Sequence, residues 1–163
     1  MDFIIRKIRE SELPLLRDFL YEAIFIPTGM EPPERSILEQ PELQVYIEGF
    51  GKRTGDHCLA AEINGRIVGA VWARIMNDYG HIDDETPSLA ISLYPEYRGM
   101  GIGTELMKRM LSVLGSCGYQ KVSLSVQKEN YAVKMYRSLG FETVKETDEE
   151  YIMLCHCAEK RIQ

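Results

Sequence analysis

Residues 98–104 (Arg-Gly-Met-Gly-Ile-Gly-Thr) have the composition of a turn that can bind an anion. The segment before them, residues 88–94, alternates apolar residues with others, which predicts a β-strand that ends at Pro95. After the turn, apolar residues recur with helical spacing at Ile102, Leu106, Met110, Val113 and Leu114. A glycine-rich turn that opens a helix leaves several backbone N–H groups unpaired at the positive end of the helix dipole. The sequence therefore predicts a phosphate-binding site at residues 98–104.

Two common nucleotide-binding loops do not match this turn. A Walker A loop ends in Gly-Lys-Ser/Thr, whereas here Gly103 is followed by Thr104 and Glu105. A dinucleotide-binding fingerprint has the spacing G-x-G-x-x-G on an early strand, whereas this turn has G-x-G-x-G in the middle of the chain. From these residues alone, a purely structural turn is the remaining alternative.

The elements that must position this turn can be predicted along the whole chain. Besides the strand before the turn, period-two patterns predict strands at 3–8, 59–63, 66–73, 121–127, 141–144 and 151–156. Asn64-Gly65 lies between two of them and is typical of a tight hairpin turn, because both positions favour positive φ. A short helix is predicted at residues 130–139, where Asn130 can cap its start and Gly140 can stop it.

Two further helices are predicted in the first third of the chain. Ser11 is the expected N-cap of the first helix, and Pro14 is tolerated in its first turn. Residues 26–33 contain three prolines and cannot continue that helix, so a loop is expected there. The second helix is expected to begin after Pro41 and to end at Gly51.

Together these elements predict an α/β fold, in which helices pack on a mixed sheet in a single domain covering residues 1–163. The 163 residues, 45% of them hydrophobic, suffice for one core. The net charge of −6 argues against non-specific binding of nucleic acid. No apolar run approaches the ~20 residues of a membrane helix, and the N-terminus lacks the layout of a signal peptide, so a cytoplasmic location is expected.

The four cysteines are Cys58, Cys117, Cys155 and Cys157, and none of them forms a C-x-x-C pair. Cys155 and Cys157 would lie on one face of the last strand. A zinc site would need further ligands at suitable spacing, and the sequence offers none, so no metal is expected. We therefore expect buried, reduced thiols that pack as small hydrophobic groups.

Two segments together resemble the signatures of one protein family. Residues 97–104 resemble the Arg/Gln-x-x-Gly-x-Gly/Ala signature of the GNAT N-acetyltransferase superfamily. Residues 130–142 resemble its Asn-x-x-Ala-x-x-x-Tyr-x-x-x-Gly-Phe pattern, in the family's order and at a typical separation. The resemblance covers roughly residues 3–156 and is weakest from 24 to 56. It implies a mostly antiparallel sheet that splays between its fourth and fifth strands, with a β-bulge in the fourth.

The resemblance implies acetyl-CoA as co-substrate. The backbone N–H groups that would wrap its pyrophosphate belong to Arg98, Gly99, Met100, Gly101, Ile102, Gly103 and Thr104. The Arg98 guanidinium would either face the phosphates or only order the turn. The exposed edge of the fourth strand, at Ile91, Ser92 and Leu93, would pair with the pantetheine arm. Asn130 would cap its helix and could also hydrogen-bond that arm.

The resemblance also implies catalytic roles. Tyr136 occupies the family's general-acid position, where a phenol can protonate the departing thiolate, and the alternative is that it only packs. The Leu93 N–H would donate to the thioester carbonyl. Glu85 is the first candidate for a general base and His81 the next, although three consecutive acids at 83–85 are also typical of a solvated loop. The amine could otherwise lose its proton to solvent.

The expected activity is direct transfer of an acetyl group to a primary amine of a small molecule or peptide. Candidates for the acceptor wall are Tyr21, Glu22, Phe25, Met30 and Glu31, which could equally be core residues and solvated charges. A second hypothesis from another class is a non-catalytic, regulatory acyl-CoA-binding module. Many members of the family pair through their sheets, which leaves a homodimer open.

Overall fold

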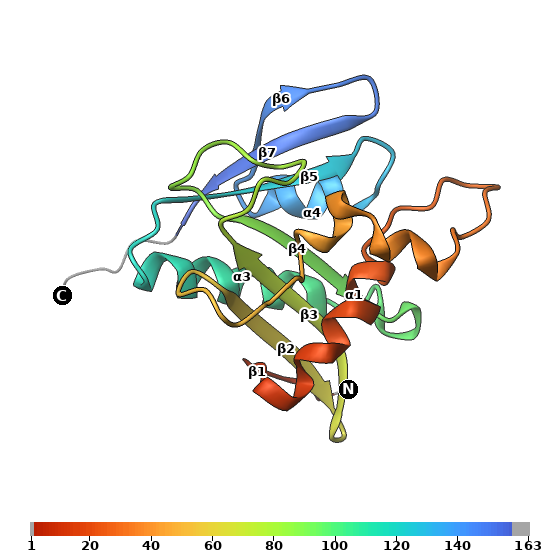
Figure 1. The fold of residues 1–163 in the computed structure, drawn as a ribbon, viewed down its shortest axis with the longest axis vertical. Coiled ribbons are helices and arrows are strands. Elements are labelled where there is room, and N and C mark those ends of the chain that lie inside the picture. The colour runs from red at the N-terminus through yellow and green to blue at the C-terminus, as the bar shows by residue number, and fades with distance from the viewer. Residues whose placement is uncertain (1, 158–163) are drawn as a thin grey trace.

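The computed structural model describes residues 2–157, and a seven-stranded mixed sheet lies at its centre (Figure 1). The strand order is β1-β2-β3-β4-β5-β7-β6, and every neighbouring pair is antiparallel except β4 and β5. The strands are β1 (Ile4–Lys7), β2 (His57–Ile63), β3 (Arg66–Arg74), β4 (Ser88–Leu93), β5 (Lys121–Gln127), β6 (Glu142–Glu146) and β7 (Glu150–His156). The α/β prediction and the predicted strands are thus confirmed, with shifts of a few residues at their ends.

The sheet splays between β4 and β5. In the described chain these two parallel strands pair at a single position, Ser88 with Ser123, where the Ser123 N–H donates to the Pro87 carbonyl at 3.0 Å. The rest of each strand has no partner on that side. The expected bulge in β4 is wrong, because its register with β3 runs without a shift from Ser88 to Leu93. The splay therefore arises from the divergence of β4 and β5 alone.

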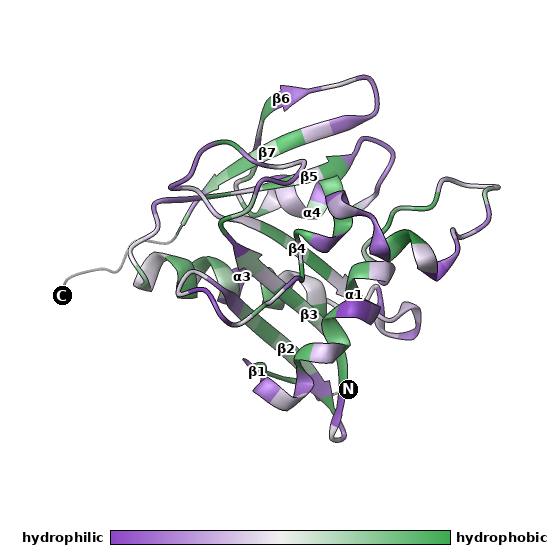
Figure 2. Ribbon diagram, in the orientation of Figure 1, coloured by the Kyte–Doolittle hydropathy of each residue, from purple (hydrophilic) through white to green (hydrophobic). Residues whose placement is uncertain are grey.

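Helices cover both faces of the sheet, with α1 in front of the strands in Figure 1 and α3 behind them. The α-helices are α1 (Leu16–Glu22), α2 (Pro41–Gln44), α3 (Ile102–Ser116) and α4 (Ala132–Ser138). Three 3₁₀ turns, η1 (Glu10–Leu15), η2 (Arg35–Glu39) and η3 (Pro95–Tyr97), connect them to the strands. Figure 2 shows hydrophobic residues along the central strands and α3, and mostly hydrophilic residues in the connections.

The two predicted N-terminal helices are shorter than expected. Ser11 is not an N-cap: it lies inside η1, which contains Pro14 and begins after Arg9. The second helix, α2, ends at Gln44 rather than at Gly51. Beyond it the chain continues in tight turns with i→i+3 hydrogen bonds, because Gly49 and Gly51 have φ of +60° and +96° and cannot continue a helix.

Each face of the sheet has its own hydrophobic core, because successive side chains of a strand alternate between the faces. On the α3 face, Leu106 and Met110 pack with Leu124 and with other strand residues. On the α1 face, Phe19 packs with Trp72. Both cores are fully buried at these positions, so the sheet is a rigid support between two helical layers.

The hairpin at Asn64-Gly65 is confirmed, with φ of +50° and +81° at the two positions. All four cysteines are free, and Cys58, Cys155 and Cys157 are buried as expected. The expectation was wrong for Cys117, which is exposed at the end of α3. Within residues 2–157, no helix has the length and apolarity needed to cross a membrane, and no group of three His, Cys, Asp or Glu side chains could hold a metal ion.

Candidate active site

A cleft of about 860 Å³ opens where β4 and β5 diverge. Its lining comes mainly from nearly the whole of β4, the C-terminal half of β5, the turn after β4, the end of α1 and the start of α4. The splayed gap lies at the centre of these elements. The cleft thus brings together segments that are more than a hundred residues apart in the sequence.

The glycine turn forms one end of the cleft. Gly99 and Gly101 have φ of +78° and +84°, a conformation that glycine adopts without strain, and a Cβ at either would meet nothing within 4 Å. Glycine is therefore favoured at these two positions by the positive φ and not by a lack of room for a side chain. The Glu105 N–H donates to the Gly101 carbonyl at 3.2 Å, so the N–H groups before Glu105 precede the first intrahelical bond of α3.

The residues of this turn after Arg98 divide into three groups. Gly99, Gly101, Gly103 and Thr104 line the cleft. Ile102 is buried and anchors the turn to the core on the α3 face, while Met100 points outward with 48% of its surface exposed. Only their backbone N–H groups could therefore contact a ligand at these last two positions.

The Arg98 guanidinium holds the turn in place. Its Nε donates to the Leu93 carbonyl at 3.0 Å, and its Nη2 donates to the Glu22 carbonyl at 3.2 Å and to Glu22 Oε2 at 3.1 Å. These contacts tie the turn to the end of β4 and to the end of α1. Of the two roles left open for Arg98, the structure favours ordering of the turn over direct contact with phosphate.

The edge of β4 that faces the gap can be derived from its register with β3. The Tyr94 N–H donates to the Val68 carbonyl at 3.0 Å, so the adjacent pair, Gly69 and Leu93, is a non-hydrogen-bonded pair. The backbone N–H groups of Leu93 and, two residues earlier, Ile91 consequently point away from β3 into the gap. Both N–H groups face the gap as expected, whereas the Leu93 carbonyl already accepts a hydrogen bond from Arg98.

Ser92 does not contribute to that edge. It alternates with its neighbours, so its backbone groups face β3, and its hydroxyl donates to the Phe19 carbonyl at 2.6 Å. Its buried hydroxyl thereby fixes α1 to β4. The expectation that the Ser92 backbone faces the gap is corrected by this register.

Two residues of the second motif line the cleft from the α4 side. Asn130 is not the N-cap of α4, which is Tyr131, but its Oδ1 accepts a hydrogen bond from the Ala132 N–H at 2.9 Å and so holds the first residue of the helix. The Tyr136 ring packs against Phe141, with the ring centroids 5.9 Å apart. Among the described residues its hydroxyl has no hydrogen-bond partner. Burial raises the pKa of Tyr136, so the phenol keeps its proton at neutral pH.

Glu85 and His81 lie outside this cleft. Glu85 is exposed and lines a separate hollow of about 300 Å³ with Lys121, at the end of the sheet where β4 and β5 are still paired. His81 Nδ1 lies 2.8 Å from the Met76 carbonyl oxygen. Neither residue is therefore placed to act as a base in the cleft. Both lie near the N-terminal end of β4, whereas β4 and β5 diverge toward their C-terminal ends.

Three of the five residues expected in an acceptor wall line the cleft. Tyr21, Glu22 and Phe25 line the cleft, whereas Met30 and Glu31 do not, and Met30 is 64% exposed. The sequence prediction did not include Tyr46, Tyr79 and Glu150, which line the cleft from other segments. Their segments carry no motif, and only the pairing of β5 with β7 brings Glu150 to the cleft.

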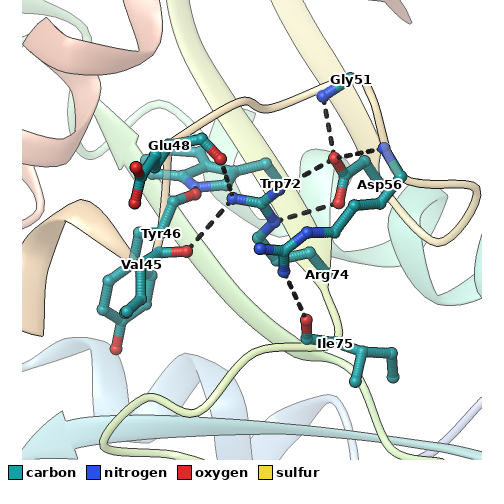
Figure 3. Close-up of polar contacts among 9 residues, drawn as sticks. Val45, Tyr46, Glu48, Gly51, Asp56, Trp72, Arg74 and Ile75 are labelled. Carbon is teal, nitrogen blue, oxygen red and sulfur yellow. Dashed lines mark hydrogen bonds and ion pairs between the residues drawn. The ribbon is translucent and has the colours of Figure 1, made fainter.

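A buried ion pair holds part of this wall against the sheet (Figure 3). Arg74, at the end of β3, is fully buried and pairs with Asp56 through Nε–Oδ1 at 3.0 Å and Nη2–Oδ2 at 3.1 Å. Its Nη1 also donates to the carbonyls of Val45 and Glu48, at 3.2 and 2.8 Å. Tyr46 lies between Val45 and Glu48 in the chain, so the ion pair helps to position it. In the sequence, an arginine at the end of an apolar strand was the one signal of this buried contact.

Comparisons with known proteins agree with this geometry. The pattern of the Acetyltransferase (GNAT) family matches residues 19–141. An acetyltransferase of Pectobacterium atrosepticum is 36% identical over 114 residues, which are 68% of this chain and 77% of that protein.

Solved structures show the same fold. PaiA N-acetyltransferase of Thermoplasma acidophilum, in complex with coenzyme A, has a TM-score of 0.71 at 19% identity, over 96% of this chain and 99% of that one. The yncA protein of Salmonella typhimurium, with its cofactor acetyl-CoA, has a TM-score of 0.67 at 17% identity, over 100% and 98%. By the match of the family pattern and by its 36% identity to the Pectobacterium protein, this chain belongs to the GNAT acetyltransferase family.

Proposed function

We propose that the chain is an N-acetyltransferase that transfers an acetyl group directly from acetyl-CoA to a primary amine of a small molecule or peptide. One observation carries the proposal: the glycine turn, the free edge of β4 and the buried phenol of Tyr136 line a single cleft. An anion site, an extended edge and a proton donor are the groups that a coenzyme A thioester requires, in the order pyrophosphate, pantetheine and sulfur.

The residues present fit the coenzyme. The N–H groups that precede the first intrahelical bond of α3 suit a pyrophosphate, and the positive end of the 15-residue helix adds to their attraction. The Ile91 backbone groups can pair with the amides of a pantetheine arm, as a further strand would, which leaves the Leu93 N–H for the thioester. When bound, acetyl-CoA supplies an acetyl group activated as a thioester.

In this proposal two groups of the chain act on the reacting atoms. The Leu93 N–H donates to the thioester carbonyl oxygen, which gains negative charge as the amine adds. A carbon–nitrogen bond forms and the carbon–sulfur bond breaks, and the Tyr136 hydroxyl gives its proton to the sulfur. The new amide nitrogen loses one proton to water, and water returns a proton to the Tyr136 phenolate. Because Glu85 lies outside the cleft, the amine loses its ammonium proton to solvent before it attacks.

The test is release of free thiol from acetyl-CoA in the presence of polyamines, amino acids, aminoglycosides and peptide N-termini, one class at a time. We expect turnover that depends on the amine and yields its acetylated form by mass spectrometry. Tight binding of acetyl-CoA by calorimetry without thiol release for any amine would refute the enzyme and support a non-catalytic acyl-CoA-binding module.

A further inference from the structure

The cleft has a second side, on the α1 face of the sheet, whose wall is chemically distinct. Strand alternation separates the two sides: Leu124 and Val126 of β5 belong to the core on the α3 face, so Ser125 and Gln127 project to the α1 face. In β7 the same rule places Glu150 on the α1 face, since Tyr151 packs on the α3 face. Gln127 and Glu150 are also paired across the two strands.

Glu150 is the cleft's one carboxylate that has no basic partner among the described residues. The other carboxylate that lines the cleft, Glu22, is paired with Arg98. Glu150 Oε1 accepts a hydrogen bond from Gln127 Nε2 at 2.9 Å, which orients the carboxylate without neutralising it. Burial, with the nearby Glu149 charge, raises the pKa of Glu150. This carboxylate would therefore be stabilised by a cation that enters the cleft.

Aromatic rings accompany this carboxylate. Tyr46 and Tyr79 line the same cleft, and the charges of Glu42 and Glu150 add to burial in raising the pKa of Tyr79, which places the Tyr79 phenol within their field. Aromatic faces beside a carboxylate form a favourable environment for an organic cation. Lysine is absent from the cleft lining, and Arg98 is occupied.

Glu150 and the end of β4 line the same cleft from its two sides. Ser88 and Ser123 are opposite each other where β4 and β5 still pair. Counting four residues along each parallel strand leads to Ser92 in β4 and to Gln127 in β5, the partner of Glu150. Glu150 thus lies across the gap from the end of β4, on the side away from the α3 turn.

We propose that Glu150 is the acceptor-recognition residue and that the acceptor carries a cationic group besides the amine that is acetylated. The reacting amine must be uncharged when it attacks, so a lasting ion pair with Glu150 needs this second cation. Its connecting chain lies against Tyr46 and Tyr79. This inference rests on the proposed function and narrows its substrate class to diamines and other dicationic amines.

The test compares three amines of equal length whose second group is cationic, neutral or anionic: a diamine, an amino alcohol and an amino acid. Binding to the protein saturated with coenzyme A is measured by calorimetry, beside kcat and KM. We expect the diamine to bind about tenfold to a hundredfold more tightly than the amino alcohol, as for a hydrogen bond to a charged group. Glu150→Gln should abolish this preference while leaving coenzyme affinity unchanged.

Glu149→Gln is the matched control, because it removes the same charge one residue away from an exposed side chain outside the cleft. It should keep the preference. Equal binding of diamine and amino alcohol to the wild type, or a preference that survives Glu150→Gln, would overturn the inference. The inference would also be overturned if Glu150→Gln lowered the binding affinity of the diamine and of the amino alcohol equally. Because binding is measured directly, absence of turnover would count against the proposed function and not against this site.

Discussion

At the scale of single residues, Tyr136 combines deep burial with a hydroxyl that no described residue engages. A phenol in this state keeps its proton, and Tyr136 lines the cleft. Tyr136→Phe retains the ring that packs on Phe141, so only the proton donor is lost. We expect kcat to fall by about 100-fold or more, as for the loss of a general acid. Coenzyme A affinity, measured by calorimetry, should stay within about twofold.

Tyr119→Phe is the control for this change, since Tyr119 is partly buried and lies outside the cleft, near His57. It should leave kcat unaltered. If Tyr136→Phe turned over at the wild-type rate, Tyr136 would be a packing residue, and the sulfur would have to take its proton from water.

Arg98 illustrates a different point at the same scale. Its charge is used on Glu22 and on the Leu93 carbonyl, so an anion bound in the turn, as the proposed function requires, would be held by backbone N–H groups and the helix dipole. Backbone groups bind a phosphate in one fixed direction and need no side-chain reorganisation. The arginine therefore serves the site by fixing the shape of the turn.

At the scale of the element, the strand–turn–helix unit makes unlike demands on its glycines. Gly101 has φ of +84°, whereas Gly103 lies inside α3, where a Cβ would make ordinary contacts with Leu93 and Ile91 at 3.8 and 3.9 Å. Gly103→Ala should raise the free energy of unfolding by up to about 1 kcal/mol, because alanine favours the helix. Gly101→Ala should lower it by about 1–2 kcal/mol, because of left-handed strain.

The same pair of variants should separate in coenzyme binding. Gly101→Ala forces the turn to change φ, which redirects the N–H groups, so we expect coenzyme A to bind about tenfold more weakly. Gly103→Ala should bind it as the wild type does. Urea unfolding and calorimetry check the two predictions, and equal affinities for both variants would show that the turn does not bind the coenzyme.

At the scale of the whole molecule, what could be predicted from the sequence follows the range of the interactions. The glycine turn and the Asn64-Gly65 hairpin are set by neighbouring residues and were predicted, whereas the cap of α4 was predicted one residue too early. Glu85 was misplaced because proximity in sequence to β4 does not reveal at which end the strands diverge.

The acceptor side could not be predicted for the same reason. Glu150 reaches the cleft only through the pairing of β5 with β7. Tyr46 lies in turns that reach the cleft because Arg74, on a strand about thirty residues later, binds their carbonyls. Such contacts depend on how the whole sheet is assembled, and local periodicity in the sequence does not predict them.

The Arg74–Asp56 pair suggests a separate support for one side of the cleft. In the proposed function the coenzyme side is formed by α3 and α4, whereas the Tyr46 segment is held by this buried pair on the α1 face of the sheet. Asp56→Asn leaves the buried guanidinium without a counter-charge and should destabilise the fold by about 3–5 kcal/mol. Glu39→Gln, which breaks the exposed pair with Arg17, should cost less than about 1 kcal/mol.

The functional consequence of Asp56→Asn should be confined to one side. At a temperature where the variant remains folded, we expect KM for the acceptor amine to rise several-fold, because Tyr46 loses its support, while coenzyme A binds with unchanged affinity. Thermal unfolding, acceptor kinetics and calorimetry measure these three quantities. A parallel loss of coenzyme affinity would contradict separate supports, and would mean that the turn at residues 98–104 depends on the acceptor wall through the contact of Arg98 with Glu22.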